Sequence, residues 1–127
     1  MDNFTKAYIE AALWSSTDDE SEPLDKNYSA DDLAPETLAT MQADCAQFQT
    51  EQAEWVAEDH RTQARAAGEC TVEASAGHDF WLTRCHHGAG FWDGDWNEPA
   101  ATKLTDAAHA FGEVDLYIGD DGKVYGQ

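Results

Sequence analysis

Apolar residues recur at helical spacing in the N-terminal half of the chain. From residue 3 to residue 15 they step by three and four, which is typical of a short amphipathic helix. A second, longer seam runs from Pro35 to about Ala67 and is interrupted once, at Gln52. Its apolar members are Leu38, Met41, Cys45, Phe48 and Trp55. We therefore expect a long second helix that begins at Pro35 and is stopped by Gly68.

The remaining segments have other patterns. The stretch 15–27 is rich in serine and like charges and has little to bury, so we expect an acidic loop, free to order on a partner. After Gly68 the apolar residues take the spacing of strands. The expected strands are Thr71–Ala74, His78–Arg84, Gly90–Asp93, Val114–Ile118 and Lys123–Tyr125, with a helix near 100–111.

Together these elements predict an α+β fold in a single domain over residues 1–127. Residues 1–67 are expected to be mainly helical, and residues 68–127 to be rich in sheet. The predicted architecture has N-terminal helices packed on a small antiparallel sheet with one inserted helix.

The balance of charge is strongly acidic. The 127 residues include 26 acidic and seven basic ones, for a formal net charge of -19, and residues 1–59 hold 15 of the acids. Such a surface repels phosphate backbones and anionic membranes, so we expect neither nucleic acid nor membrane as a direct partner. It attracts a protein with a basic nucleic-acid-binding surface. Solubility or adaptation to high salt is the alternative explanation of the charge.

Two groups of acidic residues are candidates for contacting a basic partner. They are Asp18, Asp19 and Glu20 in the acidic loop, and Asp44, Glu51, Glu54 and Glu58 on the long predicted helix. Three of the helical acids recur every seven residues, which is a rise of about 10 Å per repeat, so they would form a line of charge along one edge. A solvated helix face has the same pattern, and that alternative stays open.

The run from Gly77 to Trp96, GHDFWLTRCHHGAGFWDGDW, concentrates aromatic side chains, histidines and glycines. We expect a glycine-turned hairpin that either packs under the N-terminal helices or presents an aromatic surface to a partner. Its candidate binding residues are Arg84, His87, Trp92, Asp93 and Trp96. Because basic residues are scarce in this chain, we expect Arg84 to form an internal ion pair with Asp79 or Asp93.

Metal-binding and catalytic interpretations of this run meet specific objections. The zinc-binding residue types are His78, Cys85, His86 and His87. Adjacent histidines on a turn do not easily place both rings on one metal. Cys85 and His86, as neighbours on a strand, would point to opposite faces and not form a nucleophile and its base. A carboxylate pair drawn from Asp93, Asp95 and Glu98 is unspecific among so many acids. We expect no metal, no cofactor and no enzymatic activity.

The cysteines and the N-terminus indicate the compartment. Cys45, Cys70 and Cys85 are odd in number and too few for a disulfide scaffold. The N-terminus lacks the basic and apolar regions of a secretory leader, and no long apolar span occurs. We expect an intracellular, soluble protein. The apolar seam Leu38–Trp55 can face its own core or a second copy, so monomer and homodimer both stay open.

The motif HDFWLTR-x-x-HGAGFWD resembles that of a widespread family of small tailed-bacteriophage proteins. Its matching positions are His78, Asp79, Phe80, Trp81, Leu82, Thr83, Arg84, His87, Gly88, Ala89, Gly90, Phe91, Trp92 and Asp93. The segments FTKAYIEAALWSSTDDESEPLDKNYS and KLTDAAHAFGEVDLYIGDDGKVYGQ are similar to the same family. This chain departs from it at Cys85-His86, where the family has Asn-Gly, and at Gly94-Asp95-Trp96, which replaces a basic residue and a glycine-rich turn. The resemblance implies a phage origin, a shared fold and the cytoplasm of an infected bacterium, but no activity.

These observations predict a protein that works by binding. We expect a phage-encoded acidic protein that inhibits a host nucleic-acid-binding or defence protein, of the CRISPR or restriction type, by DNA mimicry. One alternative is a small-ligand pocket or minor enzyme at the 78–93 hairpin, built from Arg84, His87, Trp92 and Asp93. The other is an accessory phage protein without specific mimicry.

Overall fold

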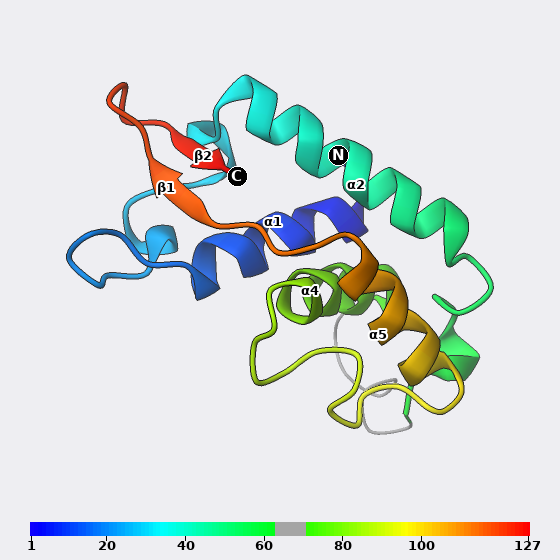
Figure 1. The fold of residues 1–127 in the computed structure, drawn as a ribbon. Helices are drawn as coiled ribbons and strands as arrows, with labels where there is room; N and C mark the ends of the chain where they lie inside the picture. Colours follow the sequence, from blue (N-terminus) through cyan, green and yellow to red (C-terminus); the bar gives the residue numbers. More distant parts are fainter. Residues whose placement is uncertain (63–70) are drawn as a thin grey trace.

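The structure is a computed structural model that describes residues 1–62 and 71–127 (Figure 1). The described residues form four α-helices and one two-stranded antiparallel sheet, which confirms the predicted α+β class. The helices are α1 (Asn3–Ser15), α2 (Pro35–Glu51), α4 (Val72–Arg84) and α5 (Ala100–Ala110). The strands are β1 (Leu116–Ile118) and β2 (Val124–Gly126). Short 3-10 turns occupy Leu24–Lys26, Ala30–Asp32 and Glu58–His60.

Local capping residues set where the helices begin. The Asp2 carboxylate accepts a 2.8 Å hydrogen bond from the Thr5 amide at the start of α1. Pro35 occupies the first turn of α2, where its missing N–H has no helical partner to lose. The Thr71 hydroxyl accepts a 3.1 Å bond from the Ala74 amide and so begins α4.

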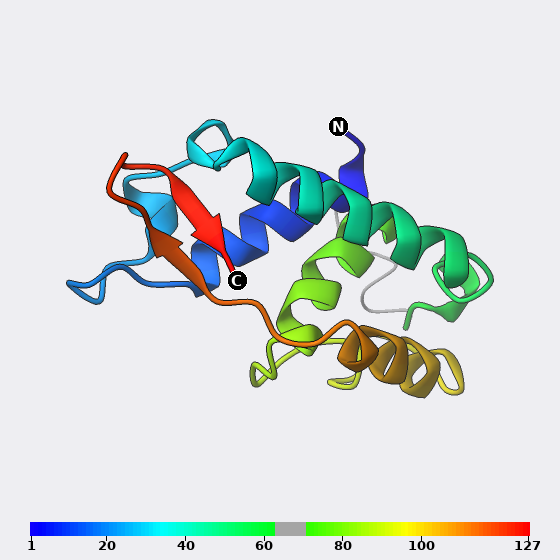
Figure 2. The same cartoon turned by 45° about the horizontal axis from the view of Figure 1, so that its top comes forward.

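Helix α4 lies at the centre of the molecule. It packs along α1 on one side and against α5 on another (Figure 1), while α2 runs over α1 on a further face (Figure 2). The close approach of α1 to α4 requires Gly77, because a Cβ at this position would collide with the Phe4 carbonyl. The helix is therefore buried on nearly all sides from Ser75 to Arg84, with His78 as its more exposed member.

Aromatic rings from four segments form the core around α4. Phe80 of α4 stacks on Phe48 of α2 with ring centroids 4.2 Å apart, and Phe91 stacks on the same ring at 5.7 Å. Phe4 of α1 contacts both Phe48 and Phe80. These four rings are fully buried, so the aromatic residues of the central motif serve mainly as core.

The sheet is a single hairpin. Ile118 pairs with Val124 and Leu116 with Gly126, and a turn over Gly119–Gly122 connects the strands. The other side of β2 is covered, because the Ala34 amide donates to the Val124 carbonyl at 2.9 Å. The predictions of this hairpin, of the helix over 3–15 and of the helix near 100–111 are confirmed.

Three strand predictions and one helix boundary are wrong. Val72–Ala74 and His78–Arg84 belong to α4, Thr71 is the N-cap of that helix, and Gly90–Asp93 forms turns. A helix that is buried on all sides has no polar face, so its sequence loses the helical period and resembles a buried strand. Helix α2 ends at Glu51, with Gln52 as its C-cap, and does not continue to Ala67. The polar interruption at Gln52 marked this end, and the predicted stop at Gly68 lies outside the described residues.

No helix in the described part of the chain combines the length and the apolar character that a bilayer crossing requires.

Candidate functional site

Arg84 is the buried centre of the motif. Its guanidinium donates to the Asp44 carboxylate at 2.9 Å, to the Tyr8 hydroxyl at 3.1 Å and to the carbonyls of Phe111 and Gly112 at 2.9 and 2.7 Å. The predicted internal ion pair is confirmed, but its expected partners, Asp79 and Asp93, are wrong. Arg84 therefore joins α4 to α1, to α2 and to the segment after α5, and it does not face a partner.

Burial and charge around Arg84 shift two acid–base equilibria. Desolvation raises the pKa of the Tyr8 hydroxyl well above its ordinary value, so the phenol stays protonated beside the guanidinium. Burial by itself lowers the pKa of Arg84, but the contributions of Tyr8 and Asp44 outweigh it, and the pKa is raised. The phenol and the guanidinium of this cluster therefore both keep their protons.

Asp79 and Trp96 form a second buried polar contact. The indole N–H of Trp96 donates to the Asp79 carboxylate at 2.8 Å, and both residues are at most 3% exposed. His78 lies on the surface side, with Nδ1 3.4 Å from the same carboxylate. The prediction of Trp96 as a partner-binding anchor is therefore wrong, because its ring fills the core and its only N–H is used internally.

The glycine-rich part of the motif closes the turn after α4. The Phe91 amide donates to the Thr83 hydroxyl at 3.0 Å. Gly90 has a φ of 153°, and a Cβ there would collide with that same hydroxyl. The stretch from Thr83 to Phe91 thus folds back on the end of α4, and its backbone geometry requires a glycine at position 90.

Three predicted motif residues stay accessible. Trp92 is 54% exposed, and Asp93 beside it is exposed as well. His87 is half-buried and lines two adjoining pockets that also share Ser15. One of these pockets is bordered by Trp14, which is 57% exposed at the end of α1. Sequence analysis missed Trp14, although its position off the apolar stripe of α1 was the available signal.

The acidic residues expected to form a line along one helix are separated. Asp44 points inward to Arg84, Glu51 is the last residue of α2, and Glu54 follows the helix. Glu58 lies in a 3-10 turn and pairs with Arg61. The prediction of a continuous charged edge is wrong, because the helix ends seven residues before Glu58.

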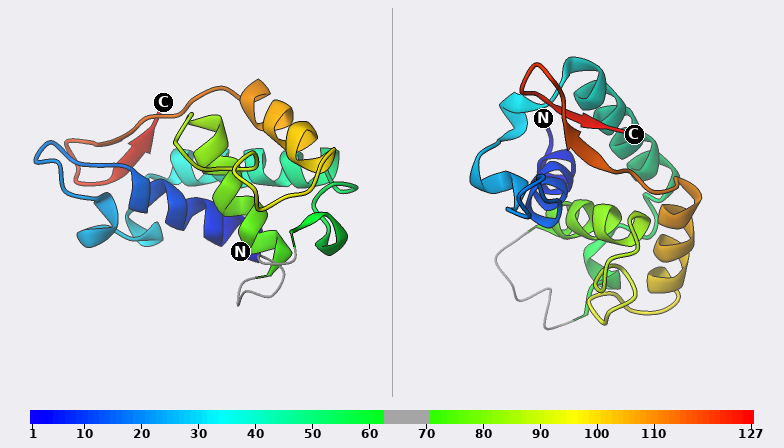
Figure 3. Two further views of the ribbon diagram at one scale, coloured as in Figure 1. Left: turned by 90° about the horizontal axis from the view of Figure 1, so that it is seen from below. Right: turned by 60° about the vertical axis from the view of Figure 1, so that its left-hand side comes forward.

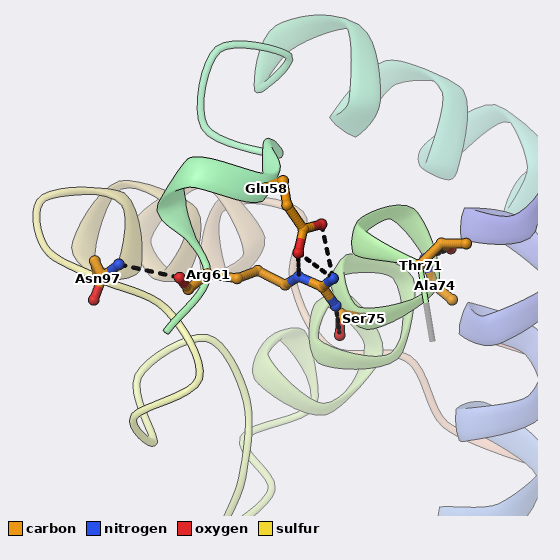
Figure 4. Close-up of polar contacts among 6 residues, drawn as sticks. All are labelled: Glu58, Arg61, Thr71, Ala74, Ser75 and Asn97. Atoms are coloured by element: carbon orange, nitrogen blue, oxygen red, sulfur yellow. Dashed lines mark hydrogen bonds and ion pairs between the residues drawn. The ribbon is translucent and has the colours of Figure 1, made fainter. Parts of the chain in front are cut away.

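Arg61 is a second buried arginine, and sequence analysis did not single it out. Its guanidinium binds the Glu58 carboxylate, with Nη2 2.7 Å from Oε2, and also donates to the Ser75 hydroxyl at 3.2 Å (Figure 4). Its carbonyl accepts a bond from the Asn97 side chain at 3.2 Å. Arg61 thereby ties the segment after α2 to α4 and to the loop before α5.

The acidic loop is a compact turn. The Asp18 carboxylate accepts bonds from the amides of Glu20 and Glu22 at 2.9 and 3.0 Å, and Thr17 bridges to Pro23. Asp19 and Glu20 are exposed at the tip. Figures 1 and 3 show this loop and the β1–β2 hairpin at the same end of the molecule.

The hairpin turn adds carboxylates to that end. Asp120 and Asp121 are exposed there. A hydrogen bond from the Tyr125 hydroxyl at 2.7 Å holds the pKa of Asp121 below its ordinary value, so it stays ionised. We call these exposed carboxylates the acidic end: Asp19, Glu20, Asp120 and Asp121.

Several residues of the motif and its surroundings have the side-chain types of metal ligands, nucleophiles or catalytic carboxylates. In residues 1–62 and 71–127, no three His, Cys, Asp or Glu side chains gather as a metal site. Burial raises the pKa of the Cys85 thiol, which opposes nucleophilic activation. Glu98, considered for a carboxylate pair, binds the Thr102 hydroxyl at 2.8 Å. Cys70 lies outside the described residues.

Comparison with known proteins returns no relative: no family model, curated protein or solved structure matches this chain.

Proposed function

We propose that this protein binds a basic partner through its acidic surface and so occupies a site that the partner uses for nucleic acid. The observation that carries the proposal is the burial of the two arginines that the structure describes. Arg61 and Arg84 are 6% and 3% exposed, and each is neutralised by a carboxylate. Among the described basic residues, those left on the surface are lysines: Lys6, Lys26, Lys103 and Lys123.

Among the described residues, the exposed Lys and Arg side chains are therefore these four lysines. One of the lysines, Lys26, is itself paired with Glu22 at 2.9 Å. Exposed carboxylates attract a basic groove over a distance that salt shortens, with a Debye length of about 8 Å at physiological ionic strength. The acidic end supports the proposal further, because two separate turns place exposed carboxylates at the same end of the molecule.

Exposed aromatic side chains are candidate anchors for such a partner. Trp92 and Trp14 are both more than half exposed, and tryptophan is enriched among residues that dominate binding energy. With the resemblance to phage proteins, the partner we propose is a host nuclease or defence protein in the cytoplasm of the infected cell, of the CRISPR or restriction type, that binds this protein in place of DNA.

A second candidate function is a small-ligand site beside His87. The observation that favours it is the pocket of about 290 Å³ lined by His87, Cys85, Trp81 and the loop after α1. A His87→Ala variant that folds normally and loses function would favour this candidate. The accessory phage protein without specific mimicry is supported if neither surface has a partner.

The experiment that tests the proposal compares two double charge reversals. Asp19→Lys/Asp120→Lys alters the acidic end, whereas Glu54→Lys/Asp106→Lys makes the same change of net charge after α2 and on α5. Partners captured from host lysate at low salt are purified and assayed for DNA binding. We expect the unaltered protein to compete with DNA and to lose affinity as salt rises, with the first variant much weaker than the second. A partner that binds both variants and the unaltered protein equally would contradict the proposal.

A further inference from the structure

The strand β1 has one unpaired edge. Asp115 exchanges two 3.0 Å backbone hydrogen bonds with Gln127, and the Gly119 amide donates to the Lys123 carbonyl at 2.8 Å. In an antiparallel ladder, residues between such pairs turn their backbone groups the other way. The N–H and C=O groups of Leu116 and Ile118 therefore point away from β2, and within the described part of the chain they make no hydrogen bond.

One end of the outer edge of β1, at Leu116, borders a slot. Figures 1 and 3 show β1 between β2 and the C-terminal end of α1. A pocket of about 290 Å³ separates the two segments. Ser15, Ser16 and Thr17 line it on one side and Glu113–Leu116 on the other, with Trp81, Cys85 and His87 also in its lining. The opposite edge of the sheet offers no such room, because Leu33 bridges to β2 there.

We propose that this slot receives an extended peptide segment of the partner, which adds to β1 as a third strand. The proposal rests on the proposed function in one respect, namely that the partner is basic. The main-chain N–H and C=O groups of this peptide segment would bond to those of Leu116 and Ile118. This contact depends on backbone geometry and not on the surface charge alone.

The faces of β1 define the side chains that the segment carries. Leu116 is buried and Ile118 half-buried, whereas Asp115 and Tyr117 are exposed on the other face. Side chains of an added strand alternate in the same way, so every second one lies beside Leu116 and Ile118 and is apolar. The others lie beside Asp115 and Tyr117, where a Lys or Arg gains an opposite charge and an aromatic face.

Charge selects a basic segment over a second copy of this chain. Two copies of this chain each carry a net charge of -19, and each exposes Asp115 beside this edge. Repulsion between these like charges opposes self-association. A segment that alternates basic and apolar residues meets the acidic face with the opposite sign.

The test uses the full chain labelled with 15N and a capped seven-residue peptide that alternates Lys and Val. We expect the peptide to slow hydrogen exchange at the Leu116 and Ile118 amides by at least about tenfold. Exchange at the Gly119 amide, which already bonds within the hairpin, is expected to stay unchanged. A peptide with Glu in place of Lys, and an isomer with all its lysines grouped at one end, serve as controls without this effect.

A substitution at Ile118 tests the site of peptide binding independently. Ile118→Pro removes an outward N–H and retains the bonds toward β2, since proline is tolerated on an edge strand. We expect it to lose peptide binding, whereas Ile118→Val retains it. If the proline variant fails to fold, the exchange measurement on the unaltered protein decides alone.

Several results would overturn strand addition. Binding of the Lys–Val peptide with shifts spread over the acidic surface and no protection of Leu116 and Ile118 would overturn it, while the proposed function would stand. Protection of these amides in peptide-free protein that grows with protein concentration would replace the peptide by a second copy. The peptide could protect the Leu116 and Ile118 amides while no basic DNA-binding protein binds this chain. That result would support strand addition at the slot and overturn the proposed function.

Discussion

Arg84 on α4 and Asp44 on α2, 40 residues apart in the sequence, form an ion pair of 2.9 Å. The pair is shielded by the rings of Phe80 and Phe111, each with its centroid 5.5 Å from the guanidinium carbon. One scarce positive charge is thus used inside the protein, where it satisfies a carboxylate that sequence analysis had assigned to the surface. This relationship explains how the motif stabilises the fold.

The first prediction concerns the stability of this pair. Arg84→Met leaves Asp44, the Tyr8 hydroxyl and two carbonyls without their donor, so we expect a loss of about 3–5 kcal/mol in the free energy of unfolding. The measurement is urea unfolding followed by circular dichroism. Lys103→Met, an exposed lysine on α5, is the matched control and should change stability by less than about 0.5 kcal/mol. Equal effects of the two variants would show that the buried pair adds nothing.

The two tryptophans of the motif allow a second comparison. Trp96→Phe retains most of the ring in the core but removes the donor to Asp79, leaving a buried carboxylate without that bond. We expect a cost of about 1–3 kcal/mol. Trp92→Phe changes an exposed side chain and should cost less than about 0.5 kcal/mol. Thermal unfolding of both variants checks this, and a larger loss for Trp92→Phe would contradict the structure.

Glycines after α4 differ in what they tolerate. Gly90→Ala places a Cβ against the Thr83 hydroxyl at a backbone angle that L-residues avoid, so we expect a cost of at least about 2 kcal/mol. At Gly88 a Cβ would have nothing within 4 Å, so Gly88→Ala is the natural control. We expect this control to unfold at nearly the same urea concentration as the unaltered protein. If Gly90→Ala is equally harmless, the turn after α4 has a different geometry.

The buried thiol of Cys45 predicts that the free energy of unfolding depends on pH in the alkaline range. Its side chain is buried between α1 and α2, and desolvation raises the pKa of the thiol to about 12. The pKa of a cysteine thiol in the unfolded chain is near its ordinary value of 9.0. The difference between these two pKa values contributes fully to the free energy of unfolding below pH 9. This contribution is lost as the pH rises toward 12. We expect Cys45→Ala to lose less stability than the unaltered protein over this interval.

Alkylation provides a direct check on the same thiol. Iodoacetamide at pH 8 should modify Cys85, which is half-buried, faster than Cys45, with peptide mass spectrometry as the readout. In urea the two rates should converge, because both thiols are then exposed. Faster modification of Cys45 in the folded protein would contradict its burial.

Elements governed by local signals could be predicted from sequence, and the central helix could not. The stripe of α1, the proline before α5 and the Gly119–Gly122 turn each act within a few residues, so their elements are confirmed. The motif helix α4 is enclosed by other segments, and its aromatic residues carry no polar face that would reveal its period. The end of α2 at Gln52 was visible as a polar break, but the apolar Trp55 beyond it suggested continuation.

The candidate site divides in the same way. Net charge, the acidic loop and the density of aromatic residues are properties of composition and order, and they hold whatever the packing. Which of these residues reach the surface depends on contacts between segments far apart. Asp44 accepts a hydrogen bond from Arg84, and Trp96 donates one to Asp79 inside the protein. Trp14 and Trp92, in contrast, are exposed. No spacing along the chain distinguishes these outcomes.

The amino-acid sequence by itself therefore determined the α+β class, the strongly acidic balance, the outer helices and the C-terminal hairpin, because each depends on composition or on short-range backbone preferences. Only the tertiary structure decided that the motif is a buried helix, that two arginines lie inside and that β1 has an open edge. These depend on burial, which is set by the packing of all segments together and which decides whether a polar side chain bonds inward or meets solvent.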